Sequence, residues 1–150
     1  RIPELMARGV HVSIGADGAP CNNRLDPFTE MRTAALIQKP RLGPTAMPAG
    51  TALRMATRAG AEALGLNCGS LEVGRRADLV RLDPAGPAWL PGGDPTSAIV
   101  YAMRPDAVSD VWIDGEPAVM DRQVVAWDFE ETVAGVQAAA ARVRARAVLA

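Results

Sequence analysis

The sequence predicts an α/β fold in which one strand ends in a candidate active-site carboxylate, and three observations support this prediction. Residues 10–17 alternate between bulky apolar and small or polar side chains, which is the period of a β-strand. Residues 26–40 and 51–65 carry apolar stripes at helical spacing. Short alternating runs between residues 77 and 127 predict mostly antiparallel strands, and a long helix follows from Asp128. The predicted order is therefore strand, helices, antiparallel strands and a final helix.

The strand predicted at residues 10–17 has two unlike faces. The apolar face, which suits packing against helices, consists of Val10, Val12 and Ile14. The other face, which suits the lumen of a barrel, consists of His11, Ser13, Gly15 and Asp17. Asp17 ends the strand and Gly18 lets the backbone turn, and the carboxyl ends of strands are where α/β proteins place their active sites. By spacing alone, Asp17 is equally well explained as a loop or helix-capping aspartate.

The helices have recognisable start and stop signals. A short helix over residues 3–8 is closed by Gly9. Asp26-Pro27 starts the next helix, because Asp caps free amide groups and Pro fits the first turn. The buried stripe of that helix consists of Phe28, Met31 and Ala35, and its stop signals are Pro40 and Gly43-Pro44. We expect one uninterrupted helix over residues 52–64, ended by Gly65.

The second half of the chain predicts small antiparallel strands between irregular loops. We expect strands at residues 77–82, 108–113, 116–120 and 123–127, and a short helix from Asp94-Pro95 to about Met103. Asp114-Gly115 suits a type I′ hairpin turn. Asp128 and Glu131 form a capping box before the last helix, whose late arginines match the helix dipole. The three tryptophans are expected in the core of this β segment, at Trp89, Trp112 and Trp127.

Composition narrows the classes of function. The formal net charge is -1, which gives no reason to expect a nucleic acid or an anionic membrane as partner. Two distant cysteines, Cys21 and Cys68, do not form a disulfide framework and favour a reducing, cytoplasmic setting. The chain starts at Arg1 within what looks like a helix–strand unit, so we expect a fragment of a longer protein.

Two further side chains could in principle bind a metal beside Asp17. His11 lies six residues earlier in the same predicted strand, which separates the two residues by ~20 Å. Ligands of one zinc ion lie within ~2 Å of it, so His11 and Asp17 cannot share a metal on an intact strand. Cys21 could act as a soft ligand, although we expect it not to bind metal. Asn22 and Asn23 are expected to brace the loop through their backbone neighbours.

Several segments, taken together, resemble the amidohydrolase superfamily in its branch of adenosine-type aminohydrolases and triazine chlorohydrolases. They lie at residues 15–26, 30–32, 34–39, 52–57, 60–61, 63–66, 69–80 and 111–115. The Gly-Ala-Asp-Gly-Ala-Pro-Cys-Asn-Asn run at residues 15–23 is most similar to the deaminases of S-adenosylhomocysteine, methylthioadenosine and 5′-deoxyadenosine. One departure is Arg122, where the family commonly has Gly, which puts the tightness of that turn in doubt.

The resemblance implies a TIM-like (β/α)8 barrel and a small β-sandwich built from both ends of the chain. Residues 1–66 would be the last barrel strand and the following helices, residues 67–127 the C-terminal part of the sandwich, and residues 128–150 a C-terminal helix. A whole barrel needs ~250 residues. The missing N-terminal part of the barrel is therefore an expected partner of this chain, and a homo-oligomer is left open.

The resemblance also implies a chemistry. Asp17 matches the aspartate that binds a divalent metal, zinc or alternatively iron, and that takes part in catalysis. The other ligands would lie outside this chain. The implied reaction is hydrolytic deamination of an adenosine-like purine nucleoside, a small-molecule substrate. Dechlorination or deamination of a triazine or another nitrogen heterocycle is the alternative within the same class. A non-catalytic structural fragment is the alternative from another class.

Overall fold

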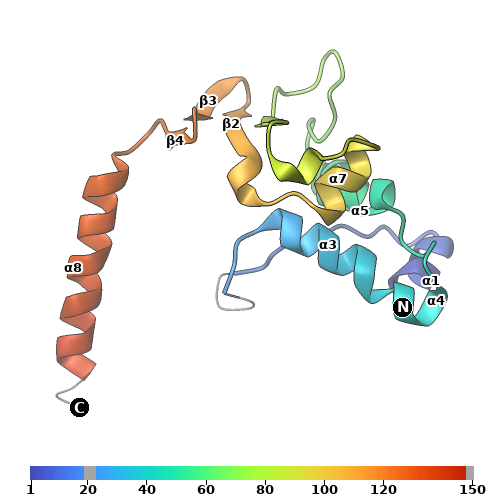
Figure 1. Cartoon of the computed structure of the whole chain (residues 1–150), viewed down its shortest axis with the longest axis horizontal. Coiled ribbons are helices and arrows are strands. Elements are labelled where there is room, and N and C mark those ends of the chain that lie inside the picture. Colours follow the sequence, from blue (N-terminus) through green and yellow to red (C-terminus); the bar gives the residue numbers. More distant parts are fainter. Residues whose placement is uncertain (19–22, 148–150) are drawn as a thin grey trace.

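The computed structural model describes residues 1–18 and 23–147, and places a helical body, a small sheet and a separate helix one after another (Figure 1). The first half contains α1 (Ile2–Ala7), α3 (Pro27–Ile37), α4 (Lys39–Leu42), α5 (Ala49–Ala56) and α6 (Arg58–Leu64). The second half contains β1 (Leu79–Leu82), the 3-10 turn η1 (Pro87–Trp89), α7 (Pro95–Tyr101), η2 (Pro105–Ala107), β2 (Val108–Ile113), β3 (Glu116–Met120), β4 (Gln123–Val124) and α8 (Phe129–Ala147). No helix in these described ranges is both long and apolar enough to cross a bilayer.

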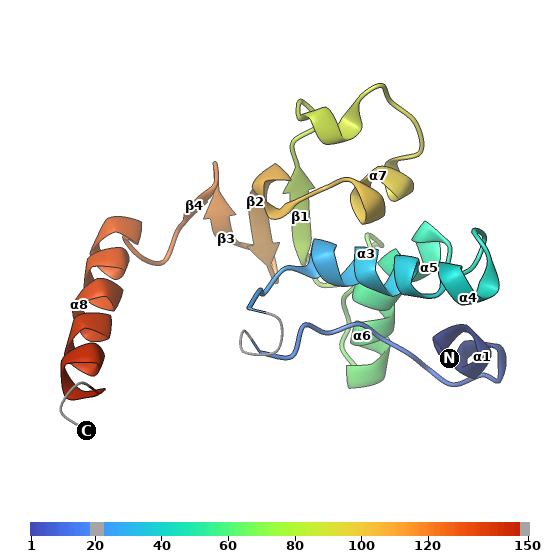
Figure 2. The same cartoon turned by 60° about the horizontal axis from the view of Figure 1, so that its bottom comes forward.

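The core lies where α3, α5 and α7 pack against one another (Figure 2). Its buried side chains are Phe28, Met31, Ala35, Met47, Ala49, Ala52, Met55, Val100 and Met103. The stripe predicted for α3 is confirmed, because all three of its residues are in this set. Ala35 and Ala52 have no exposed surface, so the helices approach closely at these small residues. Asp26 caps α3 as predicted, accepting a hydrogen bond from the Phe28 amide at 3.0 Å.

The sheet is antiparallel with the strand order β1-β2-β3-β4. Asp114 and Gly115 join β2 to β3 and both have positive φ, 54° and 87°, as a type I′ turn requires. The hairpin prediction is therefore confirmed. Asp121 and Arg122 join β3 to β4 with φ of 47° and 65°, so this turn is tight even though Arg122 replaces Gly. The Arg122 guanidinium binds the Asp83 carboxylate at 2.8 Å.

The helix α8 stands away from the helical body, beyond the sheet (Figure 1). Its predicted cap is present: the Glu131 amide donates to Asp128 Oδ1 at 2.9 Å. None of the side chains of Phe129–Ala147 is buried. Acidic residues lie in its first turn and arginines in its last, as expected from the helix dipole.

Residues 10–17 do not form the strand that the sequence predicts, which is a correction. The described part of the chain contains no ladder partner for this segment, and a strand needs neighbouring strands to pair its amide and carbonyl groups. Instead, the Ile14 amide donates to the Met55 carbonyl of α5 at 2.9 Å. The alternation correctly predicted the two faces of the segment, but it could not show whether a neighbouring strand is present to form a ladder with it.

The helix predicted at 52–64 is also wrong in one respect, because it breaks at Thr57 into α5 and α6. Thr57 has φ −126° and ψ −94°, outside the helical region. Its hydroxyl donates to the Leu53 carbonyl four residues earlier at 2.8 Å, an interaction that bends helices. A Cβ on Gly69 would lie 3.2 Å from the Thr57 carbonyl oxygen, so the following loop packs directly on the break.

Three smaller predictions need correction. Pro40 does not stop the helical region, because it lies in the first turn of α4, where a missing amide is tolerated. The strand expected at 123–127 is limited to Gln123–Val124, and the strand expected at 77–82 begins at Leu79. Trp127 is 55% exposed instead of lying in a core.

Candidate functional site

The segment that ends in Asp17 lies along the helical body with one side turned away from it. Exposure alternates along it: Val12, Ile14 and Ala16 are half-buried, whereas His11, Ser13, Gly15 and Asp17 are exposed. Val12 and Ile14 pack against the helical core. The predicted faces are therefore present, and Asp17 lies on the exposed, polar face.

Asp17 has a left-handed backbone, with φ of 54°. This region is uncommon for residues other than glycine, although Asp and Asn adopt it more readily than most. Asn23, where the described chain resumes, has a similar φ of 58°. The chain therefore turns sharply at the carboxylate, which places its side chain at a change of direction. Cys21 and Asn22 lie outside the described residues.

His11 has a structural partner. Its Nε2 donates to the Ala59 carbonyl of α6 at 2.7 Å, which ties this end of the segment to the body. The bond fixes the ring through Nε2, so His11 positions this end of the segment on α6.

The described residues, 1–18 and 23–147, contain no group of three His, Cys, Asp or Glu side chains placed to hold one metal ion. Asp17 could therefore supply one ligand, and a structural zinc site has four. The hydrogen bond between Cys68 and the Asp78 carboxylate raises the pKa of the thiol and favours its protonated form.

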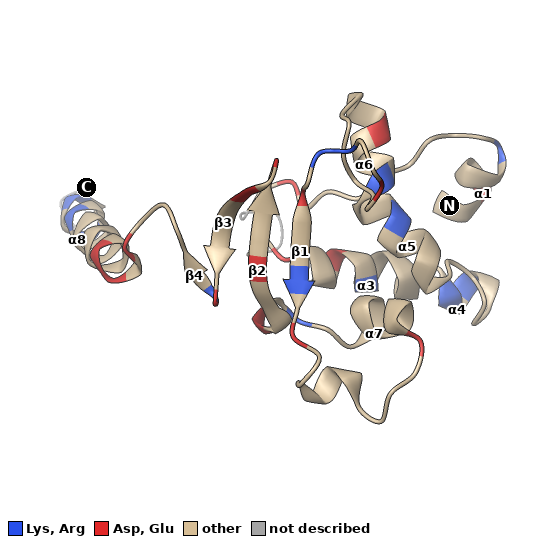
Figure 3. Cartoon of the chain, turned by 90° about the horizontal axis from the view of Figure 1, so that it is seen from above, with Lys and Arg blue, Asp and Glu red and all other residues tan. Residues whose placement is uncertain are grey.

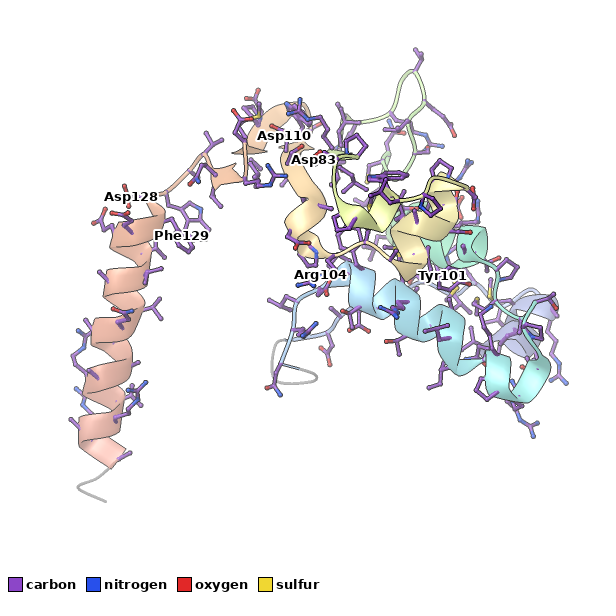
Figure 4. All side chains as sticks on the ribbon, in the orientation of Figure 1. Asp83, Tyr101, Arg104, Asp110, Asp128 and Phe129 are labelled. Atoms are coloured by element: carbon purple, nitrogen blue, oxygen red, sulfur yellow. The ribbon has the colours of Figure 1, made fainter. Side chains whose placement is uncertain are left out.

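A cavity of about 680 Å³ opens next to the end of the loop that follows Asp17. Its lining includes Arg24, Arg32, Arg104, Asp26, Asp106 and Phe28. Asp26 holds this end of the loop in place, because its Oδ2 also accepts the Thr29 hydroxyl at 2.5 Å. The arginines come from the loop, from α3 and from the segment before η2, and Arg104 lies near the start of α3 in Figure 4.

The sequence reasoning missed a buried carboxylate in the sheet, Asp110 of β2. Its side chain is fully buried, and its Oδ1 accepts the Asp121 amide at 3.1 Å. Its Oδ2 lies 2.6 Å from Arg81 Nη2. Hydrogen bonding from Ser109, then from the Asp121 amide, and the charge of Arg81 together lower the pKa of Asp110 despite its burial. The signal was visible as a polar Ser109-Asp110 pair inside an apolar strand.

Comparison with known sequences agrees with these features. The amidohydrolase family pattern matches residues 1–118. The 5-methylthioadenosine/S-adenosylhomocysteine deaminase of Syntrophobacter fumaroxidans is 44% identical over 139 residues, which are 91% of this chain and 32% of that enzyme. The 5′-deoxyadenosine deaminase of Methanosarcina mazei is 40% identical over 144 residues, 95% of this chain and 33% of that enzyme. The chain thus spans about a third of the length of these relatives.

Solved structures give the same result. An adenosine deaminase from Xanthomonas campestris with bound zinc superposes with a TM-score of 0.90 and 39% identity, over 96% of this chain and 34% of that protein. The zinc complex of an atrazine chlorohydrolase from Arthrobacter aurescens superposes with a TM-score of 0.81 and 32% identity, over 91% of this chain and 31% of that protein. The resemblance seen in the sequence is confirmed, and the region corresponds to part of a TIM-barrel hydrolase. The chain belongs to the amidohydrolase family.

Proposed function

We propose that the whole protein is a metal-dependent aminohydrolase that deaminates an adenosine-like purine nucleoside, with Asp17 as a metal ligand and catalytic residue. The observation that carries the proposal is the position of Asp17. It ends a segment whose polar face is exposed, at a residue with a left-handed backbone, in a chain that is 39% to 44% identical to deaminases along most of its length.

The chemistry suits a carboxylate at this place. A divalent metal, zinc or alternatively iron, would lower the pKa of its bound water from 15.7 toward ~7. The carboxylate of Asp17 would hold one position on the metal, and the remaining ligands would come from the rest of the polypeptide. Asp17 would also accept a proton from the attacking water and return it to the leaving amino group, which departs as ammonia. Neither Lys nor Asn could do both.

The domain arrangement is part of the same proposal. Residues 1–66 would provide the last barrel strand and its helices, and residues 67–127 one layer of a β-sandwich. The sheet register supports the second assignment: Val80 pairs with Val111, Val111 with Val119, and Val119 with Val124. Directly paired residues share a face, so these valines form one apolar row across all four strands. None of these valines is buried, and Val80 is 58% exposed, as expected of a face that a second sheet would cover in the whole protein.

Hydrolysis of a triazine or a related nitrogen heterocycle is the second candidate. It is favoured by the atrazine chlorohydrolase structure, which this chain matches at a TM-score of 0.81. Either reaction uses the same activated water.

The 150-residue chain on its own would be a non-catalytic fragment, because it supplies one metal ligand. We place the protein in the cytoplasm, where the free thiol of Cys68 would stay reduced.

Asp17→Asn in the full-length protein tests the function. We expect deamination to fall at least about 100-fold, because the variant loses the charge that binds metal and the site that takes the proton. Ammonia release from adenosine, 5′-deoxyadenosine, methylthioadenosine and S-adenosylhomocysteine measures the rate, and chloride release from atrazine tests the second candidate. Metal content by mass spectrometry should fall in parallel.

Asp128→Asn is the matched control, because Asn also caps helices and Asp128 lies at the start of α8. It should keep activity and metal. An Asp17→Asn enzyme that retained most of its rate would contradict the role given to Asp17. A wild-type protein that acted on triazines but not on purines would decide for the second candidate.

A further inference from the structure

The helix α8 carries an apolar stripe that nothing in the described chain covers. The stripe residues are alternately four and three positions apart: Phe129, Val133, Val136, Ala140, Val143 and Ala147. Phe129, Val136 and Val143 are 65%, 63% and 66% exposed. This spacing is that of the a and d positions of a coiled coil, which bury a seam against another helix. The stripe of α3, at Phe28, Met31 and Ala35, has the same kind of spacing, but α5 and α7 cover it.

The stripe is complementary to itself when a second copy is turned end for end. Rotation about the centre of the helix places Phe129 opposite Ala147, Val133 opposite Val143, and Val136 opposite Ala140. Two of the three layers therefore combine a larger with a smaller side chain, which suits the even spacing of paired helices. A parallel pair would instead place Phe129 against Phe129 and Ala147 against Ala147, leaving one end crowded and the other open.

The charges favour the same orientation. α8 is acidic at its start and basic at its end, and Figure 3 shows the two colours at opposite ends of the helix. The positions that follow Phe129, Val136 and Val143 border the seam, and they hold Glu130, Gln137 and Arg144. In an antiparallel pair Glu130 lies beside Arg144 of the second copy at both ends, and the two Gln137 side chains meet at the axis. In a parallel pair, the acidic ends would repel one another, and so would the basic ends.

We propose that α8 is a self-association surface that binds α8 of a second copy of this chain as an antiparallel, two-fold symmetric pair. Such an interface is closed, because each helix offers the same stripe to the other. With 19 residues the helix is about 28 Å long, only two to three heptads. Its seam is built of Val and Ala with a single Phe, so association is weak and depends on concentration.

Sedimentation equilibrium of the full-length protein at micromolar to millimolar concentration measures the association, with the 150-residue chain run beside it. We expect a reversible monomer–dimer equilibrium for the wild type. Val136→Glu should abolish it, because the charge would enter the middle of the seam. Circular dichroism should show that the variant keeps its helix content, since Val136 makes no buried contact within the chain.

Charge exchange tests the orientation. Glu130→Arg and Arg144→Glu should each raise the dissociation constant about tenfold, because each replaces two attractive contacts by two repulsive ones. An equimolar mixture of these two variants, and the double variant alone, should both recover wild-type association. Arg142→Glu is the matched control for Arg144→Glu, since it makes the same change of charge in the same turn but lies outside the seam, and it should have no effect.

Three results would overturn the proposal. The full-length protein could remain monomeric at every concentration, or associate equally well with Val136→Glu, which would assign the stripe to the part of the whole protein beyond these 150 residues. Arg142→Glu could weaken association as much as Arg144→Glu, which would indicate a non-specific charge effect. The charge-exchanged mixture could fail to associate, which would exclude the antiparallel pair.

Discussion

The helical body and the C-terminal part of the chain, the sheet with α8, use their apolar residues differently. In the body, α3, α5 and α7 direct their apolar faces at one another, and Met31, Ala52 and Met55 are almost inaccessible to water. In the sheet, none of the valines of the row is buried, and in α8 the side chains of Phe129, Val136 and Val143 are mostly exposed. The body can therefore stabilise itself, whereas the C-terminal part has formed its secondary structure without a covering layer.

The two parts of the chain therefore gain their stability from different interactions. Helices of the body gain free energy from removal of apolar surface from water, about 25 cal/mol per Å². The sheet relies instead on its hairpin turns and on the hydrogen bonds and ion pair that join the buried Asp110 and Ser109 to the exposed Arg81. α8 relies on its cap, its alanine content and its dipole. The three predictions below test this contrast, beginning with the largest effect.

Truncation of a body residue should cost far more than truncation of an α8 residue. Met55→Ala leaves a cavity in the core and should lower the free energy of unfolding by about 2–5 kcal/mol. Val136→Ala removes a side chain that is already mostly in water and should change it by less than about 0.5 kcal/mol in dilute solution. Urea unfolding followed by circular dichroism measures both. Equal losses would show that α8 packs on the body in solution.

The buried carboxylate of the sheet should make stability depend on acid pH. The pKa of Asp110 is lowered in the folded chain, so the stability it contributes is present above the unfolded value of ~3.9 and is lost as pH falls through the folded value. The wild type should therefore lose stability steadily below about pH 4. Thermal unfolding of Asp110→Asn should give a lower melting temperature than the wild type at pH 7, with the gap shrinking toward pH 3.

Glu4 also contributes to acid sensitivity, because its hydrogen bonds with Arg41 lower its pKa to about 2. Glu4→Gln is therefore the comparison variant from the body. Its side chain is exposed, so its loss should flatten the pH profile less than the loss of Asp110 does. A pH profile that Asp110→Asn left unchanged would contradict the role of this carboxylate in the sheet.

The smallest expected effect lies in the turn between β3 and β4. Arg122 has φ of 65°, which costs a residue with a side chain about 1 kcal/mol relative to glycine. Arg122→Gly and Arg122→Ala both lose the contact with Asp83, but only Gly removes the backbone cost. We expect the Gly variant to be more stable than the Ala variant by about 1 kcal/mol in urea unfolding. No difference between them would mean that the turn relaxes in solution.

Local signals in the sequence predicted local structure well. Asp26, Asp94 and Asp128 all cap helices through side-chain hydrogen bonds, because capping involves only the next few residues. Asp114-Gly115 forms its turn for the same reason. The resemblance at residues 15–23 also identified the family, which later comparison confirmed. Of the candidate site, the sequence predicts a single carboxylate, Asp17, and residues 1–18 and 23–147 contain no group of three side chains placed to hold a metal ion beside it.

Predictions failed where distant segments decide the outcome. Residues 10–17 have the alternation of a strand but no ladder partner in the described chain, so the amide of Ile14 binds α5 instead. The helix predicted at 52–64 breaks where Thr57 and the loop at Gly69 meet. Trp127 is apolar enough for a core but has no layer above it. In each case the sequence pattern indicated the character of the side chains, but it contained no information about which distant segments they would contact.

The sequence by itself determined the caps, the hairpin, the face on which Asp17 lies and the family, because each depends on neighbours a few residues apart or on a fixed motif. Only the tertiary structure decided that His11 is held by Ala59, that Asp110 is the buried ion of the sheet, and that α8 stands apart. These features depend on which segments meet in space. A contact between residues 48 positions apart, such as His11 and Ala59, leaves no periodic trace in the sequence.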